Sequence, residues 1–97
     1  MAGVKPNWTP TAQADLVRLQ AFLQDKNAAA AIKAATAILN AVNRIAQFPA
    51  IGQRLDGAPD FRTTYARFGQ GSYTIRYQLL DDGSITITRI WHSREDR

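Results

Sequence analysis

Apolar side chains recur at intervals of three and four residues through the first half of the chain, which predicts two helices. The first helix follows Thr9 and Pro10, because threonine is a favoured N-cap and proline is favoured as the first helical residue. Its apolar positions are Ala12, Leu16, Leu19, Phe22 and Leu23. The polar residues 25–27 are expected to end this helix.

The second predicted helix begins after Asn27, which can serve as its N-cap, and ends before Pro49, which cannot continue a helix. One apolar stripe is expected along this helix, with Ile38 at its margin. The stripe consists of Ile32, Ala35, Leu39, Val42, Ile45 and Ala46. Because the connection between the helices is short, they are expected to form an antiparallel hairpin.

The second half of the chain alternates between apolar and polar residues, which predicts strands. Residues 49–60 carry two prolines and two glycines without any period, so a loop is expected there. Three strands follow, at residues 61–68, 72–80 and 84–92. A further short strand is predicted at residues 4–8.

The middle of these three strands has an apolar and a polar face, which is typical of a half-buried antiparallel strand. The last strand loses its alternation near Thr88 and Arg89, which indicates a bulge. Alternatively, Arg89 and Trp91 continue on the face of Ile85, and Ile90 lies opposite. The order of elements predicts an α+β fold, in which an antiparallel helical hairpin packs on one face of an antiparallel sheet. A short N-terminal strand and a three-stranded C-terminal meander complete that sheet.

The chain has 97 residues, of which 45% are hydrophobic, and residues 1–97 are expected to form a single domain. The absence of cysteine excludes disulfides, thiolate metal sites and cysteine nucleophiles, and it suits a reducing cytoplasm. No apolar run approaches the ~20 residues that a membrane span requires, and the start lacks the apolar stretch of a signal peptide. A soluble cytoplasmic protein is expected.

The chain is basic, with 12 lysines and arginines against 8 acidic residues and a formal net charge of +4. Nine of the basic residues are arginines, and seven of those follow residue 50. One interpretation is an ordinary soluble surface. The other is a surface for phosphate or carboxylate groups, because a guanidinium group binds both bidentately. Composition does not choose between them.

Four of the arginines fall on adjacent predicted strands: Arg62, Arg67, Arg76 and Arg89. Arg76 belongs to the polar face of the middle strand, so it is expected on the open side of the sheet. Clustered guanidinium groups there would repel one another unless anions approach, either RNA phosphates or acidic side chains of a partner. Neutralisation by the chain's own aspartates is the alternative. The strand register decides which arginines share a face.

His92 is the one side chain whose ordinary pKa lies near neutrality, which makes it the candidate for proton transfer. The alternative is a structural histidine at a strand end. No metal site is expected, because one histidine with scattered carboxylates makes no spaced ligand set. Ser93, His92 and Asp96 lie too close along one strand end to converge as a catalytic triad. No cofactor is expected.

Four segments of the chain resemble the RelE/ParE superfamily of bacterial type II toxin–antitoxin toxins. They are NWTPTAQADL, FPAIGQR, FGQGSYTIRYQL and ITRIWHSRED, and they cover nearly the whole chain. The last segment is the most specific, and it is most similar to the ParE branch. The resemblance implies a cytoplasmic toxin, held inactive in a hetero-oligomer by a small acidic antitoxin, with a role in plasmid or chromosome stabilisation.

The two branches of this superfamily differ in function. ParE-like toxins inhibit DNA gyrase without known nuclease chemistry, whereas RelE-like toxins are ribosome-dependent mRNA endonucleases. Nuclease members commonly carry an arginine where this chain has Thr74, and several have a terminal aromatic residue that is missing after His92. His92 matches a catalytic histidine of some nucleases, but ParE-like members also carry a WH pair. A ParE-like gyrase inhibitor is therefore favoured, and a RelE-like nuclease is the alternative.

The resemblance implies site residues for both branches. A nuclease would use Arg76 and Arg89 to stabilise the transferring phosphate and His92 to move a proton, whereas a gyrase inhibitor would not be an enzyme. A relative that binds an antitoxin without attacking a target is a third reading. The candidate target-binding residues are Arg54, Arg62, Arg67, Arg76, Arg89, Trp91, His92 and Arg94.

Overall fold

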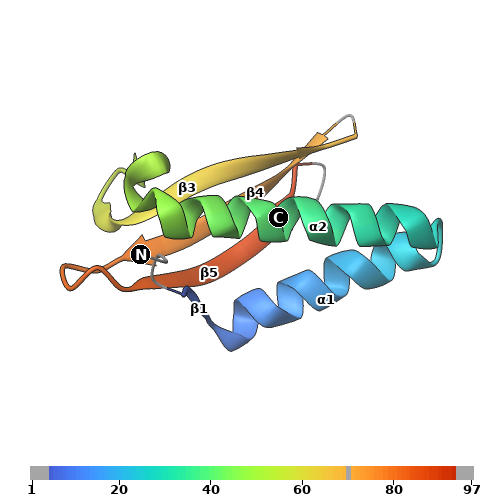
Figure 1. Cartoon of the computed structure of the whole chain (residues 1–97), viewed down its shortest axis with the longest axis horizontal. Coiled ribbons are helices and arrows are strands. Elements are labelled where there is room, and N and C mark those ends of the chain that lie inside the picture. Colours follow the sequence, from blue (N-terminus) through green and yellow to red (C-terminus); the bar gives the residue numbers. More distant parts are fainter. Residues whose placement is uncertain (1–4, 70, 94–97) are drawn as a thin grey trace.

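Two helices and a five-stranded sheet make up the computed structural model, which describes residues 5–69 and 71–93 (Figure 1). This is the predicted α+β arrangement of a short strand, a helical hairpin and a C-terminal meander. In chain order the elements are β1 (Asn7–Trp8), α1 (Pro10–Gln24), α2 (Ala28–Gln47), the 3₁₀ helix η1 (Pro49–Ile51), β2 (Gln53–Leu55), β3 (Ala58–Phe68), β4 (Gly71–Leu79) and β5 (Ile85–His92).

Both helices begin and end where the sequence predicts. The Thr9 hydroxyl accepts a hydrogen bond from the Ala12 amide at 3.0 Å, and the Asn27 side chain accepts one from the Ala30 amide at 3.1 Å. These bonds satisfy amides that have no partner within the helix, so both predicted N-caps are confirmed. α2 ends before Pro49, which is the first residue of η1.

The strands follow the order β1-β5-β4-β3-β2, and every neighbouring pair except β1 and β5 is antiparallel. The sheet is therefore mixed and not antiparallel throughout, because β1 returns to lie parallel with the last strand. β1 covers residues 7 and 8 of the predicted strand at residues 4–8, and residue 4 lies outside the described part of the chain.

The predicted loop at residues 49–60 contains regular structure that the sequence did not indicate. It holds η1 and β2, and β3 begins at Ala58, earlier than the predicted start at residue 61. Gly57 has a φ of 78°, a left-handed conformation that permits the tight turn between β2 and β3. β2 is short and has no buried residue, so no apolar alternation marks it in the sequence.

A bulge in β5 explains why the alternation of apolar and polar residues slips near Thr88 and Arg89. Arg76 of β4 pairs with Arg89, whereas the next residue, Tyr77, pairs with Ile87, so Thr88 is the extra residue. The Thr88 hydroxyl donates a hydrogen bond to the Arg76 carbonyl at 3.1 Å. Ile85, Ile87 and Ile90 are all buried as a result, which confirms the predicted bulge.

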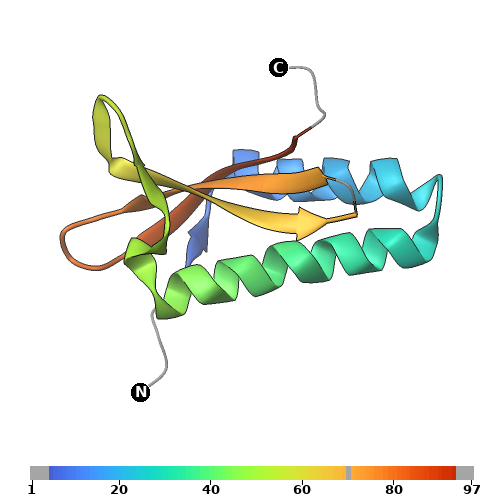
Figure 2. The ribbon, with the colours of Figure 1, turned by 90° about the horizontal axis from the view of Figure 1, so that it is seen from above.

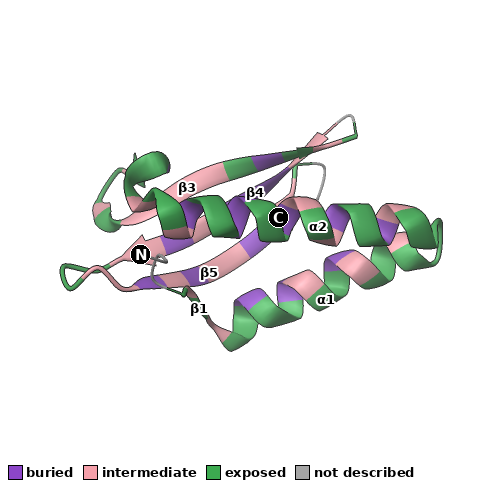
Figure 3. Ribbon diagram, in the orientation of Figure 1, coloured by how far each residue is buried: buried purple, intermediate pink, exposed green. Residues whose placement is uncertain are grey.

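The buried residues, coloured purple in Figure 3, come from both helices and from β3, β4 and β5, and they form one hydrophobic core. The buried stripe of α2 differs from the predicted one, because Ile38 is 1% exposed whereas Ile32 is 67% and Leu39 45% exposed. The observed stripe is Ala31, Ala34, Ile38, Ala41, Val42 and Ile45. α2 carries apolar residues on more than one face, so helical spacing alone is compatible with either the predicted or the observed stripe. Packing against the sheet determines which of the two is buried.

The two helices occupy different positions relative to the sheet. Figures 1 and 2 show them running antiparallel, with α2 in front of the strands in Figure 1 and α1 alongside β5. α1 therefore reaches the edge of β5 that the two-residue β1 leaves largely uncovered. Within the described residues, neither helix is long and apolar enough to cross a membrane.

Candidate functional site

Asp15, a buried residue of α1, binds the edge of β5. Its carboxylate accepts hydrogen bonds from the Ile90 amide at 2.8 Å, from Arg89 Nε at 2.9 Å and from the Arg18 guanidinium at 3.1 Å. Burial alone raises the pKa of this carboxyl, but the bonds from Ile90, Arg89 and Arg18 outweigh that effect, and the pKa lies below its ordinary value. Arg89, a predicted site residue, is thus held in an ion pair with Asp15, which it shares with Arg18.

β1 is too short to pair with the whole of β5, and Thr9 and α1 supply hydrogen bonds to β5 in place of a longer edge strand. The Thr9 amide donates to the Ile87 carbonyl at 3.0 Å, and the Thr9 hydroxyl donates to the Thr88 carbonyl at 3.1 Å. Arg18 donates to the Ile90 carbonyl at 3.3 Å. These bonds, together with those of Asp15, satisfy a sheet edge that would otherwise be open to pairing.

Arg62 lies on the side of the sheet that faces the helices, because it pairs with the buried Tyr77. Its guanidinium donates to the carbonyls of Ala50 at 3.3 Å and Gly52 at 2.8 Å. The Tyr77 hydroxyl donates to the Pro49 carbonyl at 2.6 Å and accepts from the Gly52 amide at 2.9 Å. Burial raises the pKa of Tyr77, so its hydroxyl keeps the proton that it donates. Arg62 therefore anchors η1.

The open face of the sheet carries a pocket of about 430 Å³, which we call the open-face pocket. Its lining includes Arg54 of β2, Thr63 of β3, Arg76 of β4 and Trp91 of β5. The Arg76 guanidinium lies over the Trp91 ring, 5.0 Å from the ring centroid, which is a cation–π contact. Two of the predicted target-binding residues, Arg76 and Trp91, are thus brought together on the open face. Arg54 borders the pocket, but it pairs with Arg62, so its side chain starts on the face toward the helices.

Two buried polar atoms in this pocket have no hydrogen-bond partner among the described residues. They are Nε of Arg76 and Oγ1 of Thr63. The two residues pair directly across β3 and β4, so both atoms belong to one place on the sheet. Buried donors are normally satisfied in folded proteins, which makes this pair an exception that calls for an explanation.

Thr74 occupies the position where nuclease members of the resembled superfamily carry an arginine. It is 8% exposed and pairs with Tyr65 on one side and Trp91 on the other. A small, buried hydroxyl side chain therefore lies beside Trp91 on the open face, in place of the arginine of those nuclease members.

His92 lies on the opposite side of the sheet from Arg76. It pairs with Tyr73, which is 2% exposed, and the two rings meet edge to face at a centroid distance of 5.1 Å. The imidazole lines a hollow of about 590 Å³ together with apolar side chains of α1 that include Leu19 and Phe22. The three predicted nuclease residues are therefore not gathered, because Arg76 lies on the open face, Arg89 binds Asp15, and His92 faces α1.

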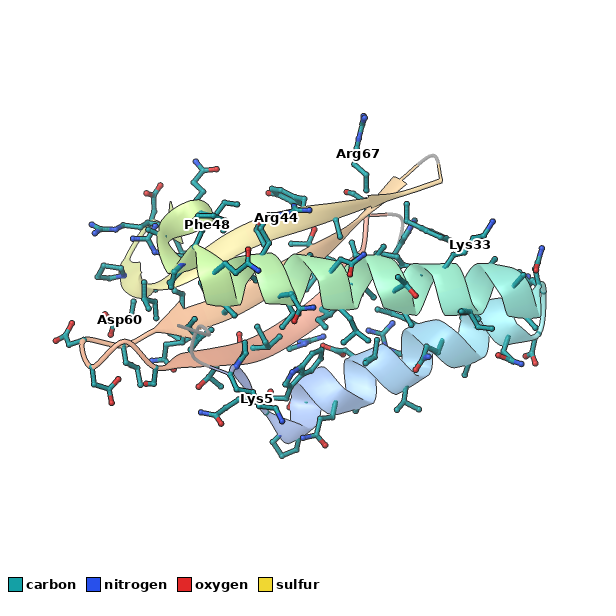
Figure 4. All side chains as sticks on the ribbon, in the orientation of Figure 1. Lys5, Lys33, Arg44, Phe48, Asp60 and Arg67 are labelled. Atoms are coloured by element: carbon teal, nitrogen blue, oxygen red, sulfur yellow. The ribbon has the colours of Figure 1, made fainter. Side chains whose placement is uncertain are left out.

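Arg67 and Arg94 complete the predicted set. Arg67 is exposed and pairs with Ser72, which places it on the same face as Arg76, and Figure 4 shows its side chain pointing away from the sheet. Arg94 lies outside the described residues. Within residues 5–69 and 71–93, no three metal-ligating side chains of the types His, Cys, Asp and Glu lie together.

Sequence reasoning missed Asp15 and Thr63. The sequence did contain an indication of a role for Asp15. This residue lies three positions after Ala12 and four before Leu19, within the apolar stripe of the helix, and a carboxylate buried there needs a partner. Thr63 had none, since only the strand register places it beside Arg76.

Comparison with known proteins identifies the family. Residues 7–97 match the model of the ParE toxin of the type II toxin–antitoxin system parDE. The chain belongs to the ParE toxin family. This confirms the resemblance to the RelE/ParE superfamily and makes the chain a type II toxin–antitoxin toxin of that superfamily.

Relatives of this ParE family member carry names from both branches. The chain is 34% identical to Toxin RelE1 of Caulobacter vibrioides over 89% of each chain, and 33% identical to Toxin RelE3 of the same organism over 91% of this chain and 92% of that one. It is 33% identical to Toxin ParE1 of Mycobacterium tuberculosis over 59% of this chain and 55% of that one.

A solved structure agrees with the fold of this ParE family member. A chain of the chromosomal ParDE system from P. aeruginosa superposes with a TM-score of 0.70 and 23% identity, covering 93% of this chain and 96% of that chain. At this level of identity the match supports the fold.

Proposed function

We propose that this chain is a ParE-like toxin of the bacterial cytoplasm that inhibits DNA gyrase by binding it and is neutralised by a cognate antitoxin. The separation of Arg76, Arg89 and His92 carries the proposal. A general acid or base has to lie within hydrogen-bond reach of the atoms that the phosphate-binding groups hold. His92 faces α1, whereas Arg76 lines the open face, so one phosphate cannot touch both.

A gyrase inhibitor needs a binding surface and no catalytic set. The open face offers such a surface, with Arg76 and Trp91 at the pocket and the exposed Arg67 on the same face. Arginine beside an aromatic ring is a combination enriched at the energetic centres of protein interfaces. These groups support contact with an acidic surface of a protein target.

The helical hairpin is the surface that we assign to the antitoxin. Both helices expose large apolar side chains, namely Val17 and Phe22 on α1 and Ile32 and Leu39 on α2. Exposed apolar groups of this size suit a partner that covers them. The formal net charge of +4 favours an acidic partner, and the matched family is defined by toxin–antitoxin pairs.

An mRNA endonuclease is the second candidate, because two relatives that match about nine tenths of the chain are named RelE1 and RelE3. In that case Arg76, Arg89 and His92 would have to meet one phosphate. This requires Arg89 to leave Asp15 and the end of β5 to turn His92 toward the open face.

The test of gyrase inhibition uses purified toxin, DNA gyrase and plasmid DNA. We expect loss of supercoiling or accumulation of gyrase-cleaved DNA with the wild type and with His92→Ala, and a weaker effect with Arg76→Ala. No effect of the wild type at a large molar excess over gyrase would overturn the proposal.

The test of the nuclease alternative maps mRNA ends in translating cells that express the toxin without antitoxin. New transcript ends that disappear with His92→Ala would establish the nuclease and contradict the gyrase proposal. Growth arrest with filamentation and a DNA-damage response, without new transcript ends, is the expected result. Expression without growth arrest would identify an inactive relative.

A further inference from the structure

We infer that the open-face pocket is a binding site for one carboxylate, the side chain of an Asp or Glu on the protein that this face meets. The inference rests on the proposed function, in which the open face contacts a protein target and does not cleave RNA. Its basis is a set of polar groups that the fold places together and leaves without partners.

The first observation is the pair of unsatisfied atoms. Nε of Arg76 and Oγ1 of Thr63 are buried and have no hydrogen-bond partner among the described residues. Cross-strand neighbours have Cβ atoms only about 5 Å apart, so one acceptor placed between these side chains can receive a hydrogen bond from both. Arg76 Nε carries only a donor, so the missing group has to be an acceptor.

The second observation is the charge in the pocket. The Arg76 side chain lies on the open face and forms no ion pair with a described carboxylate. Its positive charge is therefore not balanced by an ion pair within the described residues. One carboxylate neutralises that charge, and it can accept the side-on pair of hydrogen bonds that a guanidinium offers.

The third observation is the support behind Arg76. Its guanidinium lies over the Trp91 ring at 5.0 Å, and the Thr88 hydroxyl holds the Arg76 carbonyl at the bulge. Both contacts restrict the arginine before a ligand arrives, which reduces the entropy lost on binding. A lysine at this position would keep the charge but lose the planar donor pair.

The buried position of Nε favours a carboxylate over a nucleic-acid phosphate. Less than 1 Å² of this atom is accessible to solvent, so the Arg76 side chain has to move before a ligand oxygen reaches it. A carboxylate ends a slender side chain and requires a smaller opening than a phosphodiester, which is tetrahedral and carries a sugar on two of its oxygens. Arg67, exposed on the same face, is available to such a phosphate and lies outside the pocket lining.

The test is an NMR titration of the full chain with short capped peptides that differ in one residue. The probes are Gly-Ser-Glu-Ser-Gly, the same peptide with glutamine for glutamate, and a single-stranded hexauridylate. The readout is the Nε–Hε resonance of Arg76, identified by its absence in Arg76→Lys. We expect the glutamate peptide to shift it downfield, with about tenfold weaker binding of the glutamine peptide.

Two variants and a matched control complete the titration. Arg76→Lys and the isosteric Thr63→Val are each expected to weaken binding of the glutamate peptide, Arg76→Lys by about tenfold and Thr63→Val by about threefold. Arg67→Lys, on the same face but outside the pocket, should bind like the wild type. Equal shifts with both peptides, equal loss in Arg67→Lys, or a shift with hexauridylate alone would overturn the inference.

The titration is independent of gyrase, so it separates the two proposals. If the wild type fails to inhibit gyrase but the glutamate peptide shifts Arg76, the carboxylate site stands and belongs to another protein target. If the wild type inhibits gyrase but the glutamate peptide does not shift the Nε–Hε resonance of Arg76, the proposed function stands and the carboxylate site is wrong.

Discussion

Arg76 and Arg89 lie opposite each other on β4 and β5, yet their side chains have different surroundings. Arg89 reaches around the sheet edge to Asp15, whose buried carboxylate is also held by the Ile90 amide. Arg76 points into the open-face pocket, where Nε has no partner among the described residues. Two arginines that pair directly across neighbouring strands can therefore have separate roles. The carboxylate of Asp15 on α1 engages Arg89 and leaves Arg76 available for binding.

The largest expected effect on stability comes from changing Asp15, the partner of Arg89. Asp15→Asn removes the charge that holds Arg89 and Arg18 and leaves donors facing an amide, which should lower the free energy of unfolding by about 2–4 kcal/mol. Urea denaturation measures the change. Arg76→Lys is the control, and an equal loss in both variants would remove the distinction between the two arginines.

The pH dependence of stability should follow from the same carboxyl. The pKa of Asp15 lies below its ordinary value, so its stabilising contribution is present above the unfolded pKa of about 3.9 and is lost as pH falls through the folded pKa. The difference in unfolding free energy between wild type and Asp15→Asn should therefore shrink as the pH falls below about 4. A difference that stays constant down to pH 2 would contradict this assignment.

A double-mutant cycle sharpens the comparison further. Asp15→Asn combined with Arg89→Gln should show a coupling of about 1 kcal/mol, reduced because the Arg89 side chain is 39% exposed. The same cycle of Asp15→Asn with Arg76→Gln should show coupling within about 0.3 kcal/mol. Similar couplings in the two cycles would mean that Arg76 also depends on Asp15.

The smallest stability effect is expected at Arg76 itself. Arg76→Lys keeps the charge and the aliphatic stem over Trp91, so the free energy of unfolding should change by less than about 0.5 kcal/mol. Gyrase inhibition should nevertheless fall by about tenfold, since the planar donor pair is lost. Inhibition equal to that of the wild type would show that this arginine does not contact the target.

Local signals in the sequence were sufficient for most of the fold. Thr9 and Asn27 cap their helices through bonds to amides three residues on, and Thr88 forms the bulge where the alternation slips. These features depend on neighbours within a few positions, so periodicity and side-chain chemistry reveal them. The helical hairpin and the three-stranded meander follow from them.

The tertiary structure decided which of the predicted side chains act together. The sequence placed Ile32 and Leu39 in the buried stripe, but packing against the sheet buries Ile38 instead. The sequence also grouped Arg62 with the other arginines, although the register turns it toward the carbonyl of Gly52.

His92 shows the same limit. Trp91 precedes it in the sequence, but successive side chains of a strand lie on opposite faces of the sheet, so the two rings are on opposite faces. Helix caps and bulges are set by residues close in sequence, whereas burial and charge pairing are set by residues that only the folded chain brings together. The candidate arginines, Trp91 and His92 were therefore visible in the sequence, whereas their division between an ion-paired edge and an open pocket was decided by the register of β4 and β5 and by Asp15 of α1.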